Sequence, residues 1–365
     1  MLNSNHKTGR VLHIIPALFG AEGILGGAER YALELARYMA DVTPTRMLTF
    51  GNESRTERIG NLEIRVVGNP WYVRGQKNNP FSAAIFRECA QADVIHCHQH
   101  HILASSMAAA FANVFGKKVF VSDLGGGGWD VSAYISTDRW YHGHLHISEY
   151  SRKVFRQSDK KWSHVILGGV DTEKFSPDPL VQRQDFVLYV GRLLPHKGIN
   201  YLVDAMPEDL PLKIIGQPMD DRFLADLKQL AAGKQVSFHH NCADADIVQA
   251  YRSAMCVVLP SVYRTMYGDK SNVPELLGQT LLEGMGCGTP AICTDVASMP
   301  EIVEDGRCGF IVPPNDPVAL REKLLWLRVH NNEAERMGVA ARKRVLDAFT
   351  WPKVVERCLK IYTST

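Results

Sequence analysis

Residues 274–290 of the chain read PELLGQTLLEGMGCGTP, with seven residues between the glutamates Glu275 and Glu283. We predict a helix that begins near Leu277 and whose unsatisfied first amides and positive dipole end suit a phosphate. Glu275 then lies just before the helix, and Glu283 lies almost two turns inside it, leaning back toward its N-terminus. The plainer alternative is that one glutamate caps the helix and the other is solvated.

A second stretch, residues 190–198, reads VGRLLPHKG and follows a predicted strand. Its cations, Arg192 and Lys197, stand in a loop between a strand and a helix, where most such residues are surface charges. Beside the two glutamates a chemical role is favoured. Departure of a nucleoside diphosphate builds negative charge on the β-phosphate, which fixed cations stabilise without a metal.

These two stretches resemble the Glu-x7-Glu motif, with its Gly-Thr-Pro ending, and the Gly-Arg-Leu…Lys-Gly segment of the retaining glycosyltransferases of family 4, which have the GT-B fold. The resemblance implies that Arg192 and Lys197 hold the donor diphosphate. It also implies that Glu275 orients the sugar and that Glu283 binds the ribose. The start of the helix is then donor-binding too, through Leu277, Gly278, Gln279 and Thr280.

The N-terminal half carries weaker matches to the same family. Gly26 and Gly27 resemble the glycine pair of the first βα loop, where backbone approaches the diphosphate and the acceptor. Residues 93–98, DVIHCH, are similar to the family's strand ending in His-x-His, and the resemblance implies an active-site role for His98. His96 shares one strand face with His98, so the two cannot be judged separately.

The histidines that follow, His100 and His101, raise the alternative of a metal site. No carboxylate or cysteine nearby in the sequence completes a ligand set, so we expect no metal. His142, His144 and His146 alternate in another strand-like run and are interpreted as polar strand and loop residues.

A chain of 365 residues suits two α/β domains. Runs typical of strands alternate with helical patterns and predict two parallel sheets wrapped by helices. These runs are 10–16, 45–50, 62–67, 93–98, 118–122 and 144–148, then 186–190, 212–215, 236–239, 256–260, 290–294 and 309–312.

The Pro-rich segment 176–179 separates the two sheets and is our predicted hinge. We therefore expect an acceptor-binding domain over 1–178 and a donor-binding domain over 179–349, both Rossmann-like and doubly wound. A helix over 350–365 is expected to pack back on the first domain. In the GT-B fold the two domains face each other across a cleft lined by loops at the strands' carboxyl ends.

Composition excludes several other classes. The formal charge of +2 gives no reason to expect a nucleic-acid partner. Eight cysteines without a CxxC pair, and an N-terminus without a signal-peptide pattern, favour the cytoplasm. The uncharged stretch 102–116 is too short to span a membrane and is predicted to be a buried helix. A basic segment, 152–161, followed by Trp162 leaves peripheral membrane contact open, although a solvated face is favoured.

Three positions depart from the family pattern: Leu124 stands where many members have histidine, Gly168 where asparagine is usual, and His240 where a glycine lies near the nucleotide base. Residues 262–274 also exceed the family's usual link before the first glutamate. A loop of this length tends to signal function or disorder. Its aromatic and cationic residues suggest contact with a sugar.

The resemblance thus predicts a retaining hexosyltransferase that uses a nucleotide sugar, with a UDP-sugar favoured and a GDP-sugar as the alternative. The acceptor is expected to be a saccharide or a lipid-linked saccharide, as in polysaccharide, glycolipid or glycoconjugate synthesis, and no cofactor is expected. A nucleotide-sugar epimerase of the same fold and a non-catalytic binding protein stay open. An NAD-dependent oxidoreductase is disfavoured because neither first βα loop shows a clear Gly-x-Gly-x-x-Gly pattern.

Overall fold

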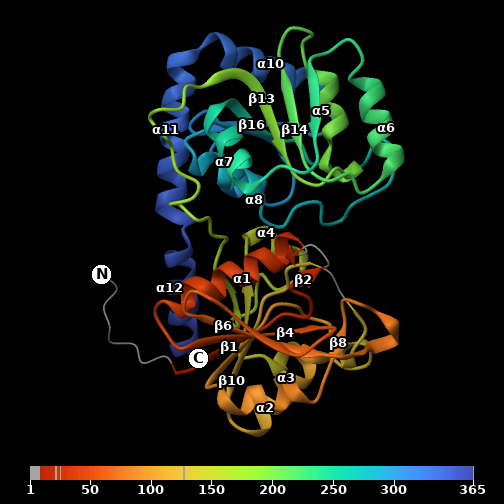
Figure 1. Cartoon of the computed structure of the whole chain (residues 1–365), viewed down its shortest axis with the longest axis vertical. Coiled ribbons are helices and arrows are strands. Elements are labelled where there is room, and N and C mark those ends of the chain that lie inside the picture. The colour runs from red at the N-terminus through yellow and green to blue at the C-terminus, as the bar shows by residue number, and fades with distance from the viewer. Residues whose placement is uncertain (1–8, 21–22, 25, 126–127, 365) are drawn as a thin grey trace. The chain divides into compact units, whose positions relative to one another are not determined.

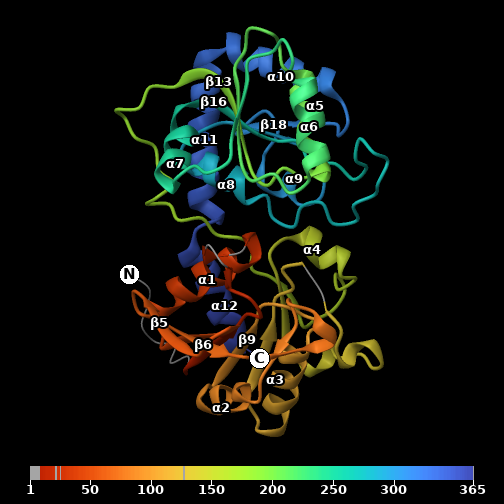
Figure 2. The same ribbon diagram turned by 45° about the vertical axis from the view of Figure 1, so that its right-hand side comes forward.

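The computed structural model describes residues 9–20, 23–24, 26–125 and 128–364, which form two α/β units (Figures 1 and 2). Unit 1 comprises Met1–Gly169 and Trp351–Thr365, and unit 2 comprises Val170–Thr350. The units divide after Gly169, whereas the boundary predicted from the sequence lies after residue 178. Among the described residues, no helix is both long and apolar enough to cross a membrane.

Unit 1 is built on an eight-stranded sheet of order β12-β11-β10-β9-β1-β4-β6-β5, in which only β5 runs antiparallel to its neighbour. The strands are β1 (Val11–Ile14), β4 (Thr45–Gly51), β5 (Arg55–Ile59), β6 (Leu62–Gly68), β9 (Val94–Cys97), β10 (Lys118–Val121), β11 (Gly143–His146) and β12 (Ser163–Val165). Two small hairpins pair β2 (Phe19–Gly20) with β3 (Gly23–Ile24) and β7 (Trp71–Tyr72) with β8 (Pro80–Phe81).

The helices of unit 1 are α1 (Gly27–Ala40), α2 (Ala84–Gln91), α3 (Leu103–Val114), α4 (Glu149–Val154) and α12 (Trp351–Ser364), with single turns η1 (Val73–Gly75), η2 (Val131–Ala133) and η3 (Asp138–Trp140). The buried face of α3 consists of small residues, including Ala104, Ala108 and Ala112, and the prediction of a buried helix there is confirmed. The C-terminal helix α12 packs on α1, where Trp351 meets Tyr31 edge-to-face with ring centroids 5.1 Å apart.

Unit 2 is built on a six-stranded parallel sheet of order β15-β14-β13-β16-β17-β18. Its strands are β13 (Gln184–Val190), β14 (Leu212–Ile215), β15 (Val236–His239), β16 (Ala254–Leu259), β17 (Ala291–Thr294) and β18 (Gly309–Val312). Counted along the chain this is the order 3-2-1-4-5-6 of a Rossmann-like fold, with its switch point between β13 and β16. The prediction of two doubly wound parallel sheets is confirmed.

The helices of unit 2 are η4 (Pro195–Lys197), α5 (Ile199–Ala205), α6 (Asp221–Leu230), α7 (Asp244–Ser253), α8 (Gln279–Gly286), α9 (Met299–Ile302), α10 (Pro317–Val329) and α11 (Asn331–Ala348). At the switch point the loop after β13 crosses the end of β16. Gly198 there has φ 66°, and an added Cβ would lie 1.9 Å from the carbonyl oxygen of Pro260. Only glycine fits this approach, which brings the Arg192–Lys197 loop against the segment that leads to Glu275.

Candidate active site

Lys197 and Glu275 form an ion pair at the carboxyl end of the unit 2 sheet. Lys197 Nζ lies 2.5 Å from Glu275 Oε2, and each side chain is only 15% exposed. The other oxygen, Glu275 Oε1, accepts a hydrogen bond of 3.2 Å from the amide of Gly278. Glu275 thus lies before α8, as predicted, but its direct pairing with Lys197 was not predicted.

Helix α8 begins at Gln279, two residues later than the predicted start at Leu277. Gly278 is its N-cap and has the left-handed φ of 75°, a conformation that glycine adopts without strain. This turn breaks the helical pattern after the buried Leu277. Gln279 and Thr280 form the first turn, which contains no acidic residue to offset the positive end of the dipole.

Glu283 is buried inside α8, with 7% of its surface exposed. The hydroxyl of Tyr251, on α7, donates a hydrogen bond of 2.9 Å to Glu283 Oε2. The next residue, Gly284, packs against β16 so closely that an added Cβ would lie 2.6 Å from Val257 Cγ1. Tyr251 therefore orients Glu283, the residue that we predicted to bind the ribose. This contact joins two separate helices, so the sequence spacing could not reveal it.

Arg192 lies two residues after the end of β13 and is exposed. In the part of the chain that the structure describes, its guanidinium makes no hydrogen bond or ion pair, and its carbonyl oxygen accepts from the hydroxyl of Tyr189 at 3.1 Å. Burial, and then the negative charge of Glu275, raises the pKa of Tyr189. Burial, and then the charge of Lys197, lowers the pKa of His196 to about 4. At neutral pH the positive charge of this loop thus comes from Arg192 and Lys197.

The neighbouring loops after β14 and β15 are tied together. His240 Nδ1 donates a hydrogen bond of 2.8 Å to the carbonyl oxygen of Gly216, and Gln217 Nε2 donates to Asn241 Oδ1 at 2.7 Å. His240, which stands where the family has glycine, therefore fastens the loop after β15 to the loop after β14.

Residues 262–274 form a folded segment that is fastened on two sides. Within it, Arg264 bridges Lys270 in antiparallel fashion. The hydroxyl of Tyr267 donates to Asp226 Oδ2 on α6 at 2.5 Å, and the amide of Ala297 donates to the hydroxyl of Tyr263 at 2.9 Å. The segment therefore spans from α6 to the loop after β17, and exposes part of Tyr263 and of Met266.

The predicted glycine pair lies at the start of α1 in unit 1: Gly26 is the N-cap and Gly27 is the first helical residue. An added Cβ on Gly27 meets no atom within 4 Å. Packing among the described residues therefore gives no reason for glycine at this position, and residues 21–22 and 25 lie outside the description.

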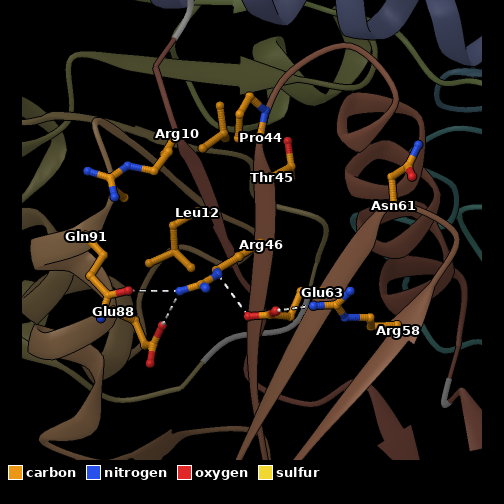
Figure 3. A pocket seen from close by; sticks show the side chains of 12 residues that line it. Arg10, Leu12, Pro44, Thr45, Arg46, Arg58, Asn61, Glu63, Glu88 and Gln91 are labelled. Carbon is orange, nitrogen blue, oxygen red and sulfur yellow. Dashed lines mark hydrogen bonds and ion pairs between the residues drawn. The ribbon is translucent and has the colours of Figure 1, made fainter.

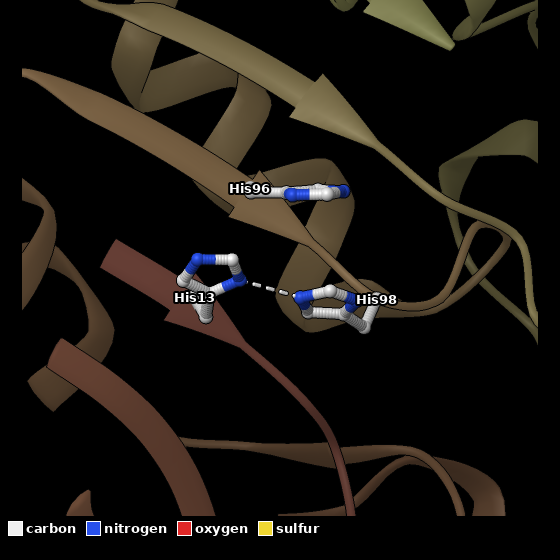
Figure 4. A group of neighbouring side chains, drawn as sticks. All are labelled: His13, His96 and His98. Carbon is white, nitrogen blue, oxygen red and sulfur yellow. Dashed lines mark hydrogen bonds between the residues drawn. The ribbon is translucent and has the colours of Figure 1, made fainter. Parts of the chain in front are cut away.

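His98 lies past the carboxyl end of β9 and is 1% exposed. Its Nε2 is 2.7 Å from Nδ1 of His13, at the carboxyl half of β1 (Figure 4). His96 uses both ring nitrogens, one with Ser122 Oγ at 2.9 Å and one with the hydroxyl of Tyr362 at 2.7 Å. His13 and Tyr362 were not identified from the sequence, since they come from strands and helices far apart along the chain.

These three histidines form a buried cluster of packed rings, in which His13 and His98 share a hydrogen bond. Burial lowers the pKa of His13 to about 3 and also lowers the pKa values of His96 and His98, so the rings are neutral. Two nitrogens 2.7 Å apart share a proton, whereas two ligands of one tetrahedral zinc lie roughly 3.3 Å apart. In this arrangement the cluster is not a metal centre, although the three side chains lie close enough together to be considered as metal ligands.

A cavity of about 330 Å³ opens at the amino ends of β1 and β4 (Figure 3). Its charged groups pair with one another: Arg46 Nε lies 2.9 Å from Glu63 Oε1, and Arg58 lies 3.3 Å from Glu63 Oε2. None of the predicted site residues lines this cavity. Because ligands of such sheets bind at the carboxyl ends of the strands, it is not a candidate donor site.

Two family models match consecutive parts of the chain. Residues 25–174 match the model described as Glycosyltransferase Family 4, and residues 170–344 match Glycosyl transferases group 1. The chain belongs to glycosyltransferase family 4. Its relatives include the D-rhamnosyltransferase WbpZ of Pseudomonas aeruginosa, 31% identical over 209 residues that cover 54% of this chain and 52% of that protein. The alpha-maltose-1-phosphate synthase of Mycolicibacterium smegmatis is 28% identical over 271 residues, 65% of this chain and 67% of that enzyme.

The matched stretches thus span about half to two thirds of these relatives. Solved structures of the same fold match along nearly the whole chain. Anabaena HepE in complex with UDP-glucose has a TM-score of 0.74 at 17% identity, covering 98% of this chain and 100% of that one. Sucrose-phosphate synthase from Thermosynechococcus elongatus has a TM-score of 0.72 at 18% identity, covering 98% of each chain. At such identities the likeness establishes the fold, and the predicted GT-B fold is confirmed.

Proposed function

We propose that this family 4 member transfers a hexosyl unit from a nucleoside diphosphate sugar to an acceptor hydroxyl, with retention at the anomeric carbon. The observation that carries the proposal is the Lys197–Glu275 ion pair, at the switch point of the unit 2 sheet and in front of the N-terminus of α8. A cation for phosphate and a carboxylate for sugar hydroxyls stand there in direct contact.

The ion pair suits exchange with a donor. A diphosphate competes with Glu275 for Lys197, because it offers more negative charge and several acceptor oxygens. Once displaced, Glu275 accepts hydrogen bonds from sugar hydroxyls, while Arg192 and the first amides of α8 add to the phosphate contacts. Two cations and a helix N-terminus stabilise the charge on the leaving diphosphate, so the donor site needs no divalent ion.

Retention follows from substitution on the face that the leaving group occupies. The bond from the anomeric carbon to the β-phosphate oxygen breaks, the acceptor oxygen bonds to that carbon on the same face, and the departing phosphate oxygen takes the acceptor proton. Arg192 and Lys197 hold the charge that develops. Glu283, oriented by Tyr251, binds the ribose hydroxyls.

A UDP-sugar is the favoured donor and a GDP-sugar the alternative. HepE was solved with UDP-glucose, whereas one relative is named as a GDP-mannose-dependent mannosyltransferase acting on a phosphatidylinositol monomannoside. Acceptors of the saccharide or lipid-linked saccharide class, in polysaccharide, glycolipid or glycoconjugate synthesis, agree with these names. For the acceptor side we retain Gly26, Gly27 and His98, which the family resemblance implies.

We place the enzyme in the cytoplasm, where nucleotide sugars are held. The basic segment before Trp162 offers little for insertion into lipid, since the Trp162 ring packs on His144 with centroids 4.5 Å apart and Arg152 pairs with Glu149 at 2.8 Å. Membrane contact through this segment is then electrostatic and peripheral.

The test is turnover of UDP- and GDP-sugars by the whole chain, with and without simple alkyl glycosides as acceptors. We expect acceptor-dependent release of the nucleoside diphosphate and, by proton NMR, a product whose anomeric configuration matches the donor. Isomerised donor without transfer would identify an epimerase, and tight donor binding without any turnover would identify a binding protein. A product with the opposite anomeric configuration would refute the proposed retention but not the proposed transfer.

A further inference from the structure

A second cavity of unit 1, of about 180 Å³, lies at the carboxyl ends of β9, β10 and β11. Four histidines and two aspartates line it: His100, His101, His144, His146, Asp123 and Asp138. The proposed transfer reaction uses none of these residues. Carboxylates and imidazoles that converge on a cavity are the donor set of transition-metal sites.

The backbone brings two consecutive histidines to the same side of this cavity. The ring centroids of His100 and His101 are 3.8 Å apart. His101 has φ 52°, in the left-handed region that residues other than glycine rarely adopt. The amide of Gly128 donates to the carbonyl oxygen of His101 at 3.1 Å and supports this conformation. Strain of this kind persists where the surroundings over-determine it, often at functional sites.

Asp123 completes a set of three ligands. It follows β10, which lies beside β9 in the sheet. One ligand atom from each of His100, His101 and Asp123 lies within 4.8 Å of the other two. Along the sequence no carboxylate near the two histidines completes a ligand set, because the partner comes from the next strand of the sheet rather than from the same loop.

Hydrogen bonds occupy one ring nitrogen of His101 and leave the other for a ligand. Ser132 Oγ donates to Asp130, so it accepts the bond of 2.8 Å from Nδ1 of His101, and Nε2 keeps its lone pair. His100 Nε2 contacts Thr137 Oγ1 at 3.3 Å, which leaves Nδ1 of His100 as the nitrogen that can bind a metal ion. A histidine ligand of a metal ordinarily donates its other nitrogen in this way.

We propose that His100, His101 and Asp123 bind one divalent transition metal ion of the zinc class, through His100 Nδ1, His101 Nε2 and the Asp123 carboxylate. The remaining positions are open to solvent or to an oxygen ligand. His144 is not part of the set, because its Nε2 donates to the carbonyl oxygen of Asp138 at 3.0 Å and its Nδ1 accepts from Gln157 at 3.1 Å. All three proposed ligands belong to unit 1, whereas the proposed donor-site residues belong to unit 2.

The experiment is a zinc titration of the whole chain after dialysis against a chelator, read by competition with a chromophoric chelator. Cobalt binding, read from its visible absorption, provides a second signal. We expect one equivalent of tightly bound zinc. His101→Gly, which keeps the left-handed backbone, and Asp123→Asn should each weaken zinc binding by about 100-fold or more, and Ser132→Ala by about 10-fold.

The matched control is His164→Gln, in the neighbouring strand β12 but outside the cavity, which should bind zinc as the unmodified chain does. Circular dichroism confirms that each variant is folded. If the chain binds no equivalent of zinc tightly, the proposal is overturned. Unchanged affinity in both His101→Gly and Asp123→Asn would also overturn it, as would an affinity lost in His13→Gln alone, which would assign the metal to the other histidine cluster.

Discussion

The two units share a strand order around their central strand, yet their switch points carry opposite chemistry. In unit 1 the carboxyl ends of β1 and β9 hold His13 and His98, which are neutral and buried. In unit 2 the equivalent position, beyond β13 and β16, holds the partly exposed ion pair of Lys197 and Glu275. The fold fixes where a site lies, and the side chains decide what it binds.

The contrast has a physical origin in packing. The imidazoles of unit 1 pack on one another, with His96 and His98 rings 4.3 Å apart, and exclude water. In unit 2, glycines such as Gly198 bring backbone loops together and leave the charged side chains at the sheet edge. Unit 2 is therefore prepared to bind an anion, whereas unit 1 buries uncharged polar groups.

The largest expected effect concerns the cations of unit 2. Lys197→Ala and Arg192→Ala should each lower turnover by about 100-fold or more, the usual scale for losing one preorganised charge-stabilising group. Lys197→Ala should be worse, since it also leaves Glu275 without its partner. Lys343→Ala, which removes a surface cation paired with Asp347, is the matched control. Near-normal transfer by both site variants would break the donor-site assignment.

A smaller effect separates the two glutamates. Glu283→Gln should weaken binding of the donor and of the free nucleoside diphosphate alike, because Glu283 is the proposed ribose-binding residue. Glu275→Gln should spare the free nucleotide and impair transfer. Calorimetry with both ligands measures the difference, and Tyr251→Phe should reproduce part of the Glu283 effect by removing its 2.9 Å hydrogen bond. Equal losses in the two glutamate variants would contradict this division of roles.

A still smaller effect is expected from the segment 262–274. Replacing residues 263–272 by a short Gly-Ser linker should raise the acceptor KM or change the preferred acceptor, while donor binding stays nearly intact. The exposed parts of Tyr263 and Met266 are the expected contacts. Tyr267→Phe is the control for anchoring, because it removes only the bond to Asp226. Unchanged kinetics of both hydrolysis and transfer would leave the segment without a part in recognition.

The last effect concerns stability rather than activity and is a difference in acid sensitivity between the units. The lowered pKa values of His13, His96 and His98 mean that below pH 6.5 the unfolded chain binds more protons than the folded one. The free energy of unfolding of unit 1 should therefore be constant above about pH 6.5 and fall on acidification, by up to about 1.4 kcal/mol per pH unit for each histidine. In unit 2, His196 has a lowered pKa and is only half-buried.

Hydrogen exchange, corrected for the intrinsic effect of pH, measures this difference unit by unit. Peptides from β1 and β9 should lose protection between pH 7 and pH 5 before peptides from β13 and β16 do. An equal loss in both units would contradict the assignment of neutral buried histidines to unit 1.

The sequence predicted most of the framework because its signals are local. Strands β14, β15 and β18 begin and end where the apolar runs do. Strand β5 was missed because it is an edge strand with mostly exposed residues and little apolar alternation. The start of α8 was placed too early because the left-handed turn at Gly278 interrupts a pattern that reads as helical.

Residues of the candidate sites could be predicted where a sequence motif contains them, but the contacts between these residues could not. Glu275 and Lys197 were found from their own segments, but their pairing depends on two loops that meet at the sheet edge. The partnership of Asp123 with His100 and His101 depends on neighbouring strands, so no spacing in the sequence could indicate it. Contacts of this kind are set by the order of strands in the sheet.

The most direct test of the central claim is calorimetric titration of UDP and GDP into the whole chain in the presence of excess chelator. We predict that one of these nucleotides binds without a divalent ion, and that Arg192→Ala and Lys197→Ala each weaken its binding by about 10-fold or more, as expected for lost charge-assisted hydrogen bonds. Binding that vanishes with the chelator, or that is the same in both variants as in the unmodified chain, would contradict a donor site built from these two cations and the N-terminus of α8.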